Sequence, residues 1–129
     1  MALIRRPDEI VARARTLIGT RFLPQGRTAE GGLDCIGLVA LAVGARNVPR
    51  DYPLRGGTLA RLEAELKSAG LGPVQEMVAG DILVLAPGAG QLHLGVFTGT
   101  GLVHGDAGLR RVVERPLPLP WPVLGIWRL

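Results

Sequence analysis

Residues 31–44 read GGLDCIGLVALAVG and hold Cys35, the single cysteine of the chain. After the cysteine, apolar residues recur every three or four positions, which is the pattern of a helix that buries one face. The residues of this stripe are Ile36, Val39, Ala40 and Val43. Asp34 is a suitable N-cap, so we predict a helix that begins at Cys35 and places the thiol in its first turn. The free backbone N–H groups and the helix dipole at that position favour a thiolate.

The same cysteine also has a structural interpretation. Free cysteines are often buried as small hydrophobic side chains that serve packing alone. A single cysteine excludes an internal disulfide and a cysteine-rich zinc site, so packing has to stabilise the fold. The stretch by itself leaves the nucleophilic and the structural interpretation open.

The length and composition predict one domain over residues 1–129. The chain has 129 residues, of which 47% are hydrophobic, enough for one core and too few for two domains. Its net charge is +4, and fourteen of the fifteen basic residues are arginine, which favours an anionic partner such as cell wall or nucleic acid. The basic residues are scattered and only one Tyr and two Phe are present. A stacking surface is therefore poorly supported, and we expect no nucleic-acid binding.

The N-terminal sequence MALIRRPDEIVARA does not have the form of a secretory signal, because Arg5, Arg6 and Pro7 interrupt its apolar segment. No uncharged apolar run reaches about 18 residues, so we expect no membrane span. The sequence therefore predicts a soluble protein that is made in the cytoplasm without a signal peptide.

Two further helices are predicted around the Cys35 stretch. One covers residues 7–19, with Asp8 as its cap, and the other runs from its cap at Thr58 to about residue 68. The segments between the three helices contain glycine and proline and are predicted as loops. These loops are residues 20–33 and 45–57.

The periodicity changes in the second half of the chain, where five short strands are predicted. They cover residues 81–86, 93–98, 101–105, 108–115 and 123–128. Helices followed by an antiparallel meander give an α+β domain. The proline-rich residues 116–122 are predicted as a surface connection, and Asp81 is predicted to structure the turn before the first strand.

The two histidines of the chain, His93 and His104, bracket a predicted hairpin. Gly99 and Thr100 suit a two-residue type II′ turn, which has glycine first. With that turn Gly95 faces His104, and His93 lies two residues along on the same face, within diagonal reach. The sequence therefore predicts that the two imidazoles share one face of the sheet.

A thiol at a helix start and two imidazoles on one sheet face are the parts of a cysteine-nucleophile site. Cys35 would attack a carbonyl, His93 would take and return the proton, and His104 would orient His93 and fix its tautomer. Serine catalysis is nearly excluded because Ser68 is the only serine, and the scattered carboxylates form no spaced pair. A zinc site with Cys35, His93 and His104 as ligands is the alternative, although zinc ligands are usually closer in sequence. We predict no metal and no cofactor.

Four motifs occur in an order and spacing that resemble the NlpC-type cell-wall peptidases, compact papain-like cysteine peptidases of bacteria and phages. The motifs are Asp34-Cys35-Ile36-Gly37, Gly80-Asp81-Ile82-Leu83, His93-Leu94-Gly95-Val96-Phe97 and Leu102-Val103-His104. The resemblance covers most of the chain, from the first helix to the final strand. It implies a papain-like NlpC-type α+β fold. In that fold the N-terminal helices, one with the nucleophilic cysteine at its N-terminus, pack on a five- to six-stranded antiparallel sheet.

The resemblance implies a peptidoglycan endopeptidase that cuts an amide bond of the stem peptide, typically between D-glutamate and the diamino acid. It implies Cys35 as nucleophile, His93 as base and His104 as third polar residue, the roles that the residues themselves suggest. It adds Asp34, which in this family tends to bind the free amine of the stem peptide. Helix capping is the competing role of Asp34, and the two roles are compatible.

Two positions depart from the family pattern. Ile36 stands where family members often have a serine that helps to hold the substrate amine, and Phe22 stands where many have an aromatic hydroxyl. Apolar residues after the cysteine resemble the phage-borne branch, whose members sit at tail tips and open the wall during DNA delivery. We therefore expect a tail component of a phage, prophage or gene-transfer particle. Other tail or hub proteins would be its partners, and it would act in the periplasm or cell wall.

Two other functions stay open. One is a structural tail-hub protein that keeps the fold without turnover. The other is a thiol amidase or acyltransferase on the same scaffold, which acts on a different amide or ester. Specificity would depend on the loops at residues 20–33 and 45–57, so the sequence does not separate these functions.

Overall fold

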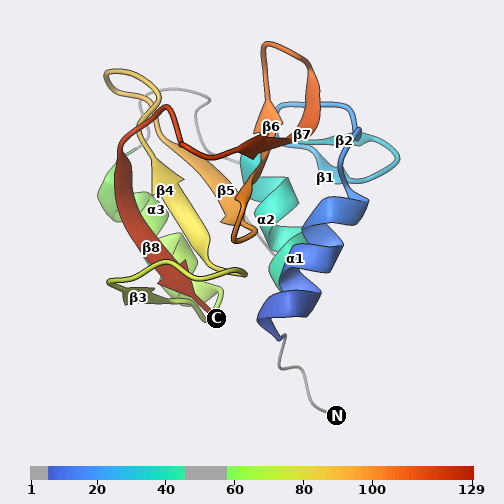
Figure 1. The fold of residues 1–129 in the computed structure, drawn as a ribbon. Helices are drawn as coiled ribbons and strands as arrows, with labels where there is room; N and C mark the ends of the chain where they lie inside the picture. Colours follow the sequence, from blue (N-terminus) through green and yellow to red (C-terminus); the bar gives the residue numbers. More distant parts are fainter. Residues whose placement is uncertain (1–5, 46–57) are drawn as a thin grey trace.

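The computed structural model describes residues 6–45 and 58–129, and Figure 1 shows how the elements are arranged. Within these residues the helices are α1 (Pro7–Thr16), α2 (Cys35–Val43) and α3 (Leu59–Ser68). The strands are β1 (Arg27–Thr28), β2 (Gly32–Leu33), β3 (Gly72–Val74), β4 (Ile82–Leu85), β5 (His93–Phe97), β6 (Gly101–Asp106), β7 (Arg111–Pro116) and β8 (Val123–Arg128). None of the helices described is long and apolar enough to cross a membrane.

The main sheet has six strands in the order β3-β8-β4-β5-β6-β7, and all neighbours are antiparallel. The predicted α+β class is confirmed. The predicted meander is confirmed from β4 to β7 but wrong for β8, which returns to pair with β4. Strand β4 is buried along its whole length, so the backbone groups at its open edge need a partner strand.

Two departures concern segments without a strand prediction. Strand β3 adds a sixth strand at the edge of the sheet, where it pairs with β8. The predicted loop at residues 20–33 contains the small β1–β2 pair. From residue 46 on, the predicted loop at 45–57 lies outside the described residues.

Helix α1 starts differently from the prediction. Arg6 is the N-cap and makes no side-chain capping bond, so the prediction of Asp8 as the cap is wrong. Pro7 occupies the first helical position, which its fixed φ and missing N–H suit, and Asp8 therefore falls within the first turn. The Thr58 cap of α3 is confirmed, since its hydroxyl accepts the Arg61 N–H at 3.1 Å.

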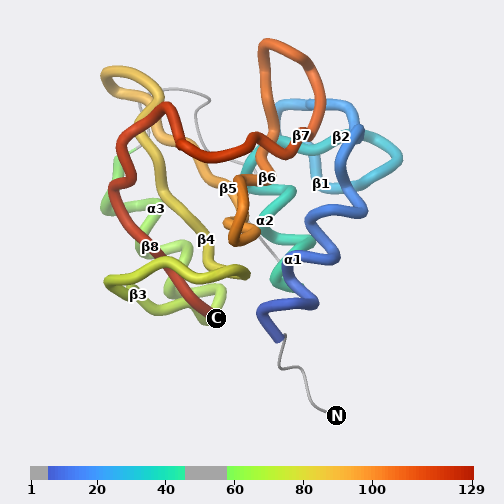
Figure 2. The backbone as a smooth tube through the Cα atoms, in the orientation of Figure 1, coloured from blue at the N-terminus to red at the C-terminus, as the bar shows by residue number. Residues whose placement is uncertain are grey.

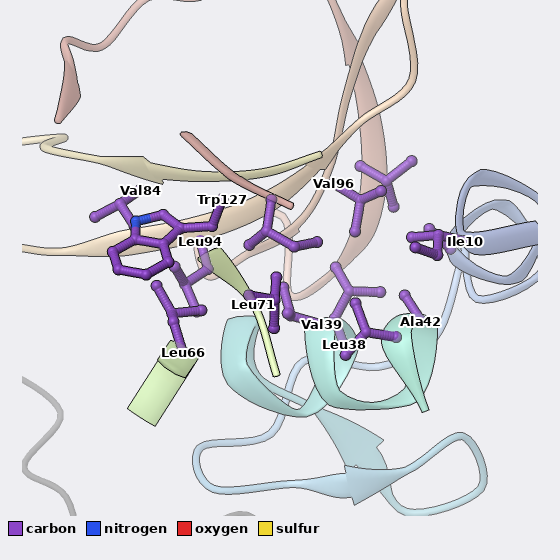
Figure 3. Close-up of a cluster of buried hydrophobic side chains, with 14 of the residues drawn as sticks. Ile10, Leu38, Val39, Ala42, Leu66, Leu71, Val84, Leu94, Val96 and Trp127 are labelled. Atoms are coloured by element: carbon purple, nitrogen blue, oxygen red, sulfur yellow. The ribbon is translucent and has the colours of Figure 1, made fainter. Parts of the chain in front are cut away.

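One hydrophobic core lies between the helices and one face of the sheet (Figure 3). Alternate residues of the strands supply it, as the pleat requires. Its larger members are Ile10, Leu33, Leu38, Val39, Val43, Leu66, Leu71, Ile82, Val84, Leu94, Val96, Val103, Val112 and Trp127. A second cluster is formed by Leu83, Leu85, Phe97 and Leu102, against which Leu119 and Trp121 pack. The proline-rich link from β7 to β8 thus covers this second cluster (Figure 2).

Asp81 structures the turn before β4, as predicted. It is 1% exposed, and its carboxylate accepts the Val78 N–H at 2.9 Å. Arg128 of β8 binds the same carboxylate through Nε at 2.8 Å and Nη2 at 2.9 Å. The buried charge is therefore paired, and the bond joins β8 to the turn that leads into β4.

Candidate active site

Helix α2 begins at Cys35, as predicted, and Asp34 is its N-cap. The Asp34 carboxylate accepts the Gly37 N–H at 2.8 Å, which satisfies one of the free N–H groups of the first turn. At the other end Gly44 adopts a left-handed φ of 76°, and its N–H bonds to the Ala40 carbonyl. The helix packs against α1 and the strands β5 and β6, so its position relative to the sheet is fixed.

The Asp34 carboxylate has further partners inside the protein. Its Oδ2 accepts the Gln25 N–H at 2.8 Å, and its Oδ1 accepts Arg27 Nη1 at 3.1 Å in a buried ion pair. Asp34 is itself only 5% exposed. The capping role is confirmed, whereas binding of a substrate amine stays a prediction, in which the amine would have to compete with Arg27.

Glycines allow the preceding loop to run directly against α2. A Cβ on Gly37 would lie within 3.0 Å of the Gly26 carbonyl oxygen, and a Cβ on Gly26 would lie within 3.0 Å of the Gly32 carbonyl oxygen. These close backbone approaches fix the first turn of the helix against the loop. They therefore also fix the position of Cys35.

Strands β5 and β6 pair in the predicted register, with Val96 opposite Val103. The turn between them has Gly99 at a φ of 96°. This register places His93 and His104 on one face, and the two rings are hydrogen-bonded, with 2.9 Å between His93 Nε2 and His104 Nδ1. The predicted pairing of the imidazoles is confirmed.

The surroundings hold both imidazoles in the neutral form. Burial, with a smaller contribution from His104, lowers the pKa of His93 to about 4, against the opposing effect of Asp106. Burial also lowers the pKa of His104, an effect that Asp106 opposes and the Arg115 charge reinforces. At neutral pH the pair is therefore uncharged, and one of the two nitrogens in its hydrogen bond carries the proton.

Trp121 is a third ring at the pair that the sequence analysis did not include. Its ring centroid lies 5.6 Å from that of His93 and 5.3 Å from that of His104, with interplanar angles of 87° and 82°. Trp121 also contacts Arg115, whose Cζ lies 5.6 Å from the indole centroid. A tryptophan within the otherwise proline-rich residues 116–122 was the available signal, but the sequence places it far from both histidines.

The start of α2 lies against the two strands that carry the histidines. The backbone N–H of Leu94, the residue after His93, lowers the pKa of the half-buried Cys35 thiol against the effect of burial. A Cβ on Gly105, the residue after His104, would lie 3.6 Å from the Cys35 nitrogen. The structure thus brings Cys35 beside the neighbour of each histidine. Within the residues described, no hydrogen bond joins the thiol to either ring.

The thiol is not acidic in the free protein. Burial raises the pKa of Cys35 to about 11, and the negative charge of Asp34 contributes in the same direction. The N–H groups of Leu94, Cys35 and Ile36 oppose this rise without cancelling it. The N–H groups at the helix start thus favour a thiolate as predicted, but burial outweighs them.

The donor atoms are not arranged as a metal site. Across residues 6–45 and 58–129, no group of three or more His, Cys, Asp or Glu side chains could hold a metal ion. The alternative zinc site of Cys35, His93 and His104 thus has no support in the geometry.

The two positions that depart from the family pattern both adjoin the site. Phe22 lies beside the residue after His104, since a Cβ on Gly105 would be 3.4 Å from its ring. Ile36 is partly buried and packs against the main core. Neither side chain offers a hydroxyl to a substrate at these places.

No protein-family model matches the chain, and no curated protein matches its sequence. Twelve solved chains are similar to it, among them the following three. The NlpC/p60 domain of the peptidoglycan hydrolase SagA has a TM-score of 0.59 and 26% identity, over 87% of this chain and 90% of that one. The peptidoglycan hydrolase RipB from Mycobacterium tuberculosis has a TM-score of 0.61 and 22% identity, over 95% of this chain and 63% of that one. The P60 domain of an M. avium subspecies paratuberculosis antigen has a TM-score of 0.57 and 18% identity, over 94% of this chain and 91% of that one. The predicted NlpC-type fold is confirmed.

Proposed function

We propose that the chain is a peptidoglycan hydrolase that acts as a cysteine peptidase. The observation that supports this most directly is the hydrogen bond between His93 and His104 beside the helix that begins at Cys35. The same fold occurs in solved domains that are named peptidoglycan hydrolases. A thiol, a base and a residue that orients the base are what nucleophilic attack on an amide requires.

In the proposed reaction the Cys35 sulfur attacks the amide carbonyl of the substrate. His93 Nε2 is engaged with His104, which leaves Nδ1 as the atom that takes the thiol proton. The proton then passes to the leaving amine as the C–N bond breaks and a thioester forms. Water, deprotonated by the same imidazole, hydrolyses the thioester and restores the thiol.

The pKa values indicate when the proton moves. A thiol with a pKa of about 11 and an imidazole with a pKa of about 4 are both neutral before substrate binds. Proton transfer from Cys35 to His93 therefore accompanies the attack and does not precede it. Exclusion of water by the substrate would strengthen the attraction between the thiolate and the imidazolium as they form.

The finer proposal is a γ-D-glutamyl-diamino acid endopeptidase, carried by a phage-like tail that opens the wall for DNA delivery. It rests on the resemblance of the motifs around Cys35 and His93. Asp34 is the proposed contact of the substrate amine, with other tail or hub proteins as partners and the periplasm or cell wall as the site of action. The missing hydroxyls at Ile36 and Phe22 indicate that the contacts to the stem peptide differ from the family pattern.

The second candidate is a structural tail-hub protein without turnover. One observation favours it, namely that the thiol is neutral and forms no hydrogen bond with either imidazole in the described part of the chain. The two candidates predict opposite results with the same substrate.

The test is incubation of the purified protein with sonicated peptidoglycan and with muropeptides, followed by mass spectrometry of the products. A hydrolase releases stem-peptide fragments, Cys35→Ala abolishes the release, and His93→Ala lowers it by about a hundredfold or more. Arg15→Ala, on the exposed surface, is the control and should keep full activity. Cleavage of a different amide bond would correct only the finer proposal. Cleavage that survives Cys35→Ala would contradict the mechanism, and no cleavage by the native protein would favour the hub.

A further inference from the structure

The three rings of His93, His104 and Trp121 are mutually perpendicular. The interplanar angle of the two imidazoles is 88° with centroids 5.0 Å apart, and the indole meets them at 87° and 82°. In perpendicular pairs the positive edge of one ring meets the negative face of the other. The indole is therefore placed to act on the electrostatics of the pair and not only on its packing.

The hydrogen bond between the imidazoles allows two arrangements of protons. In the first, His93 Nε2–H donates to His104 Nδ1, so His93 keeps a lone pair on Nδ1 and His104 carries its proton on Nε2. In the second, His104 Nδ1–H donates to His93 Nε2, and His93 then carries its proton on Nδ1. Only the first arrangement leaves His93 able to accept a proton from a thiol.

The atom that distinguishes the two arrangements is His104 Nε2. His104 is 2% exposed, and its Nε2 has no hydrogen-bond partner within the described residues. In the first arrangement this nitrogen is an N–H donor, and an aromatic face can receive it as a weak hydrogen bond. In the second it is a lone pair, which the negative face of an indole repels. An indole whose face meets the Nε2 edge of His104 would thus favour the first arrangement.

We propose that Trp121 is a positioning residue that fixes the tautomers of the two histidines, by receiving His104 Nε2–H on its indole face. The consequence for catalysis, a free lone pair on His93 Nδ1, rests on the proposed function. Arg115 stacks on the indole and, with burial, disfavours protonation of His104, so the choice is between two neutral tautomers. Asp106, on the same strand as His104, acts in the opposite direction on both rings and is the charged group that limits this preference.

Nitrogen-15 NMR of the histidine side chains measures the tautomers directly, because the whole chain has two histidines and so only four ring nitrogens. At pH 7 we expect both histidines to carry their proton on Nε2. The Nε2–H of His93 then donates to His104 Nδ1. In Trp121→Leu, which keeps an apolar side chain without a π face, the preference of His104 for Nε2–H should fall by about two- to fivefold. Trp121→Phe should largely retain it.

Trp127→Phe is the matched control, since Trp127 is a 2% exposed core tryptophan whose ring makes no contact with the histidines. It should lower the melting temperature and leave both tautomers unchanged. A native protein with His104 protonated on Nδ1 would overturn the proposal, as would an unchanged tautomer ratio in Trp121→Leu. The measurement needs no substrate, so it separates this proposal from the peptidase proposal. Absence of cleavage by a protein with the expected tautomers refutes the peptidase alone.

Discussion

Replacement of Gly37 by alanine tests the contact that positions the Cys35 helix. Alanine inside a helix is normally worth about 1 kcal/mol over glycine, and Gly37 lies in the first turn of α2, so propensity alone predicts a stabilisation of at most this size. The structure predicts the reverse, because the new Cβ would lie within 3.0 Å of the Gly26 carbonyl oxygen, a backbone atom that cannot rotate away. Overpacking of this kind costs about 1–3 kcal/mol, sometimes more. We expect Gly37→Ala to lower the free energy of unfolding by up to about 2 kcal/mol after the gain in propensity.

The assay is urea denaturation together with thermal melting, in which a loss of this size corresponds to a fall of about 5 °C for a domain of this length. Gly72→Ala is the control, since no heavy atom lies within 4 Å of its new Cβ and its φ is not left-handed. The control should melt within about 2 °C of the native protein. If Gly37→Ala melts at or above the native temperature, the close approach of the loop to the helix is not present and the argument from it fails.

Three further predictions concern charged and titrating groups. Arg128→Ala leaves the buried Asp81 carboxylate without its ion pair and should lower the urea midpoint clearly. Loss of the exposed ion pair in Arg15→Ala should leave the midpoint nearly unchanged, and equal urea midpoints for the two variants would contradict this. Because the pKa of His93 falls to about 4 on folding, the unfolded chain binds more protons below about pH 6.5. The free energy of unfolding should therefore decrease by about 2 kcal/mol from pH 7 to pH 5. Urea titrations at the two pH values should show a smaller decrease in His93→Gln. With a pKa of about 11, Cys35 should react with iodoacetamide at pH 7 about a hundred times or more slowly than free cysteine. Above pH 7 the rate of alkylation should rise about tenfold per pH unit. A rate that is already fast and independent of pH below pH 7 would refute the neutral thiol.

The helices were predictable because their signals are local. The period of the apolar residues and the caps at Asp34 and Thr58 lie within a few residues of each helix start, and both caps are present. The hairpin register was predictable for the same reason, since a two-residue turn with glycine first fixes which residues face each other. The prediction of Asp8 as a cap was wrong because Pro7 occupies the first helical position and Asp8 falls within the first turn.

The sheet order was not predictable from the same signals. Strand β3 reads Gly-Pro-Val, a poor strand sequence that forms only because β8 offers it an edge. Strand β8 pairs with β4 across about forty residues of chain, and periodicity carries no information on such a partner. Trp121 is placed on the histidines by this return of the chain to β4, so the sequence could not assign it to the site.

Asp34 and the helix start act in opposite directions on the pKa of Cys35, which the sequence alone did not reveal. Asp34 stabilises the helix as its cap, typically by about 1 kcal/mol, and the same charge raises the pKa of the adjacent thiol. Charge–dipole effects at a helix end amount to about 0.3–1 kcal/mol at exposed sites, which is less than burial of a thiolate costs. In the proposed peptidase, the helix start would therefore position Cys35 without activating it. Activation would then come from a neutral His93 with a free lone pair, so the proposed chemistry would depend on the tautomer of the histidine pair.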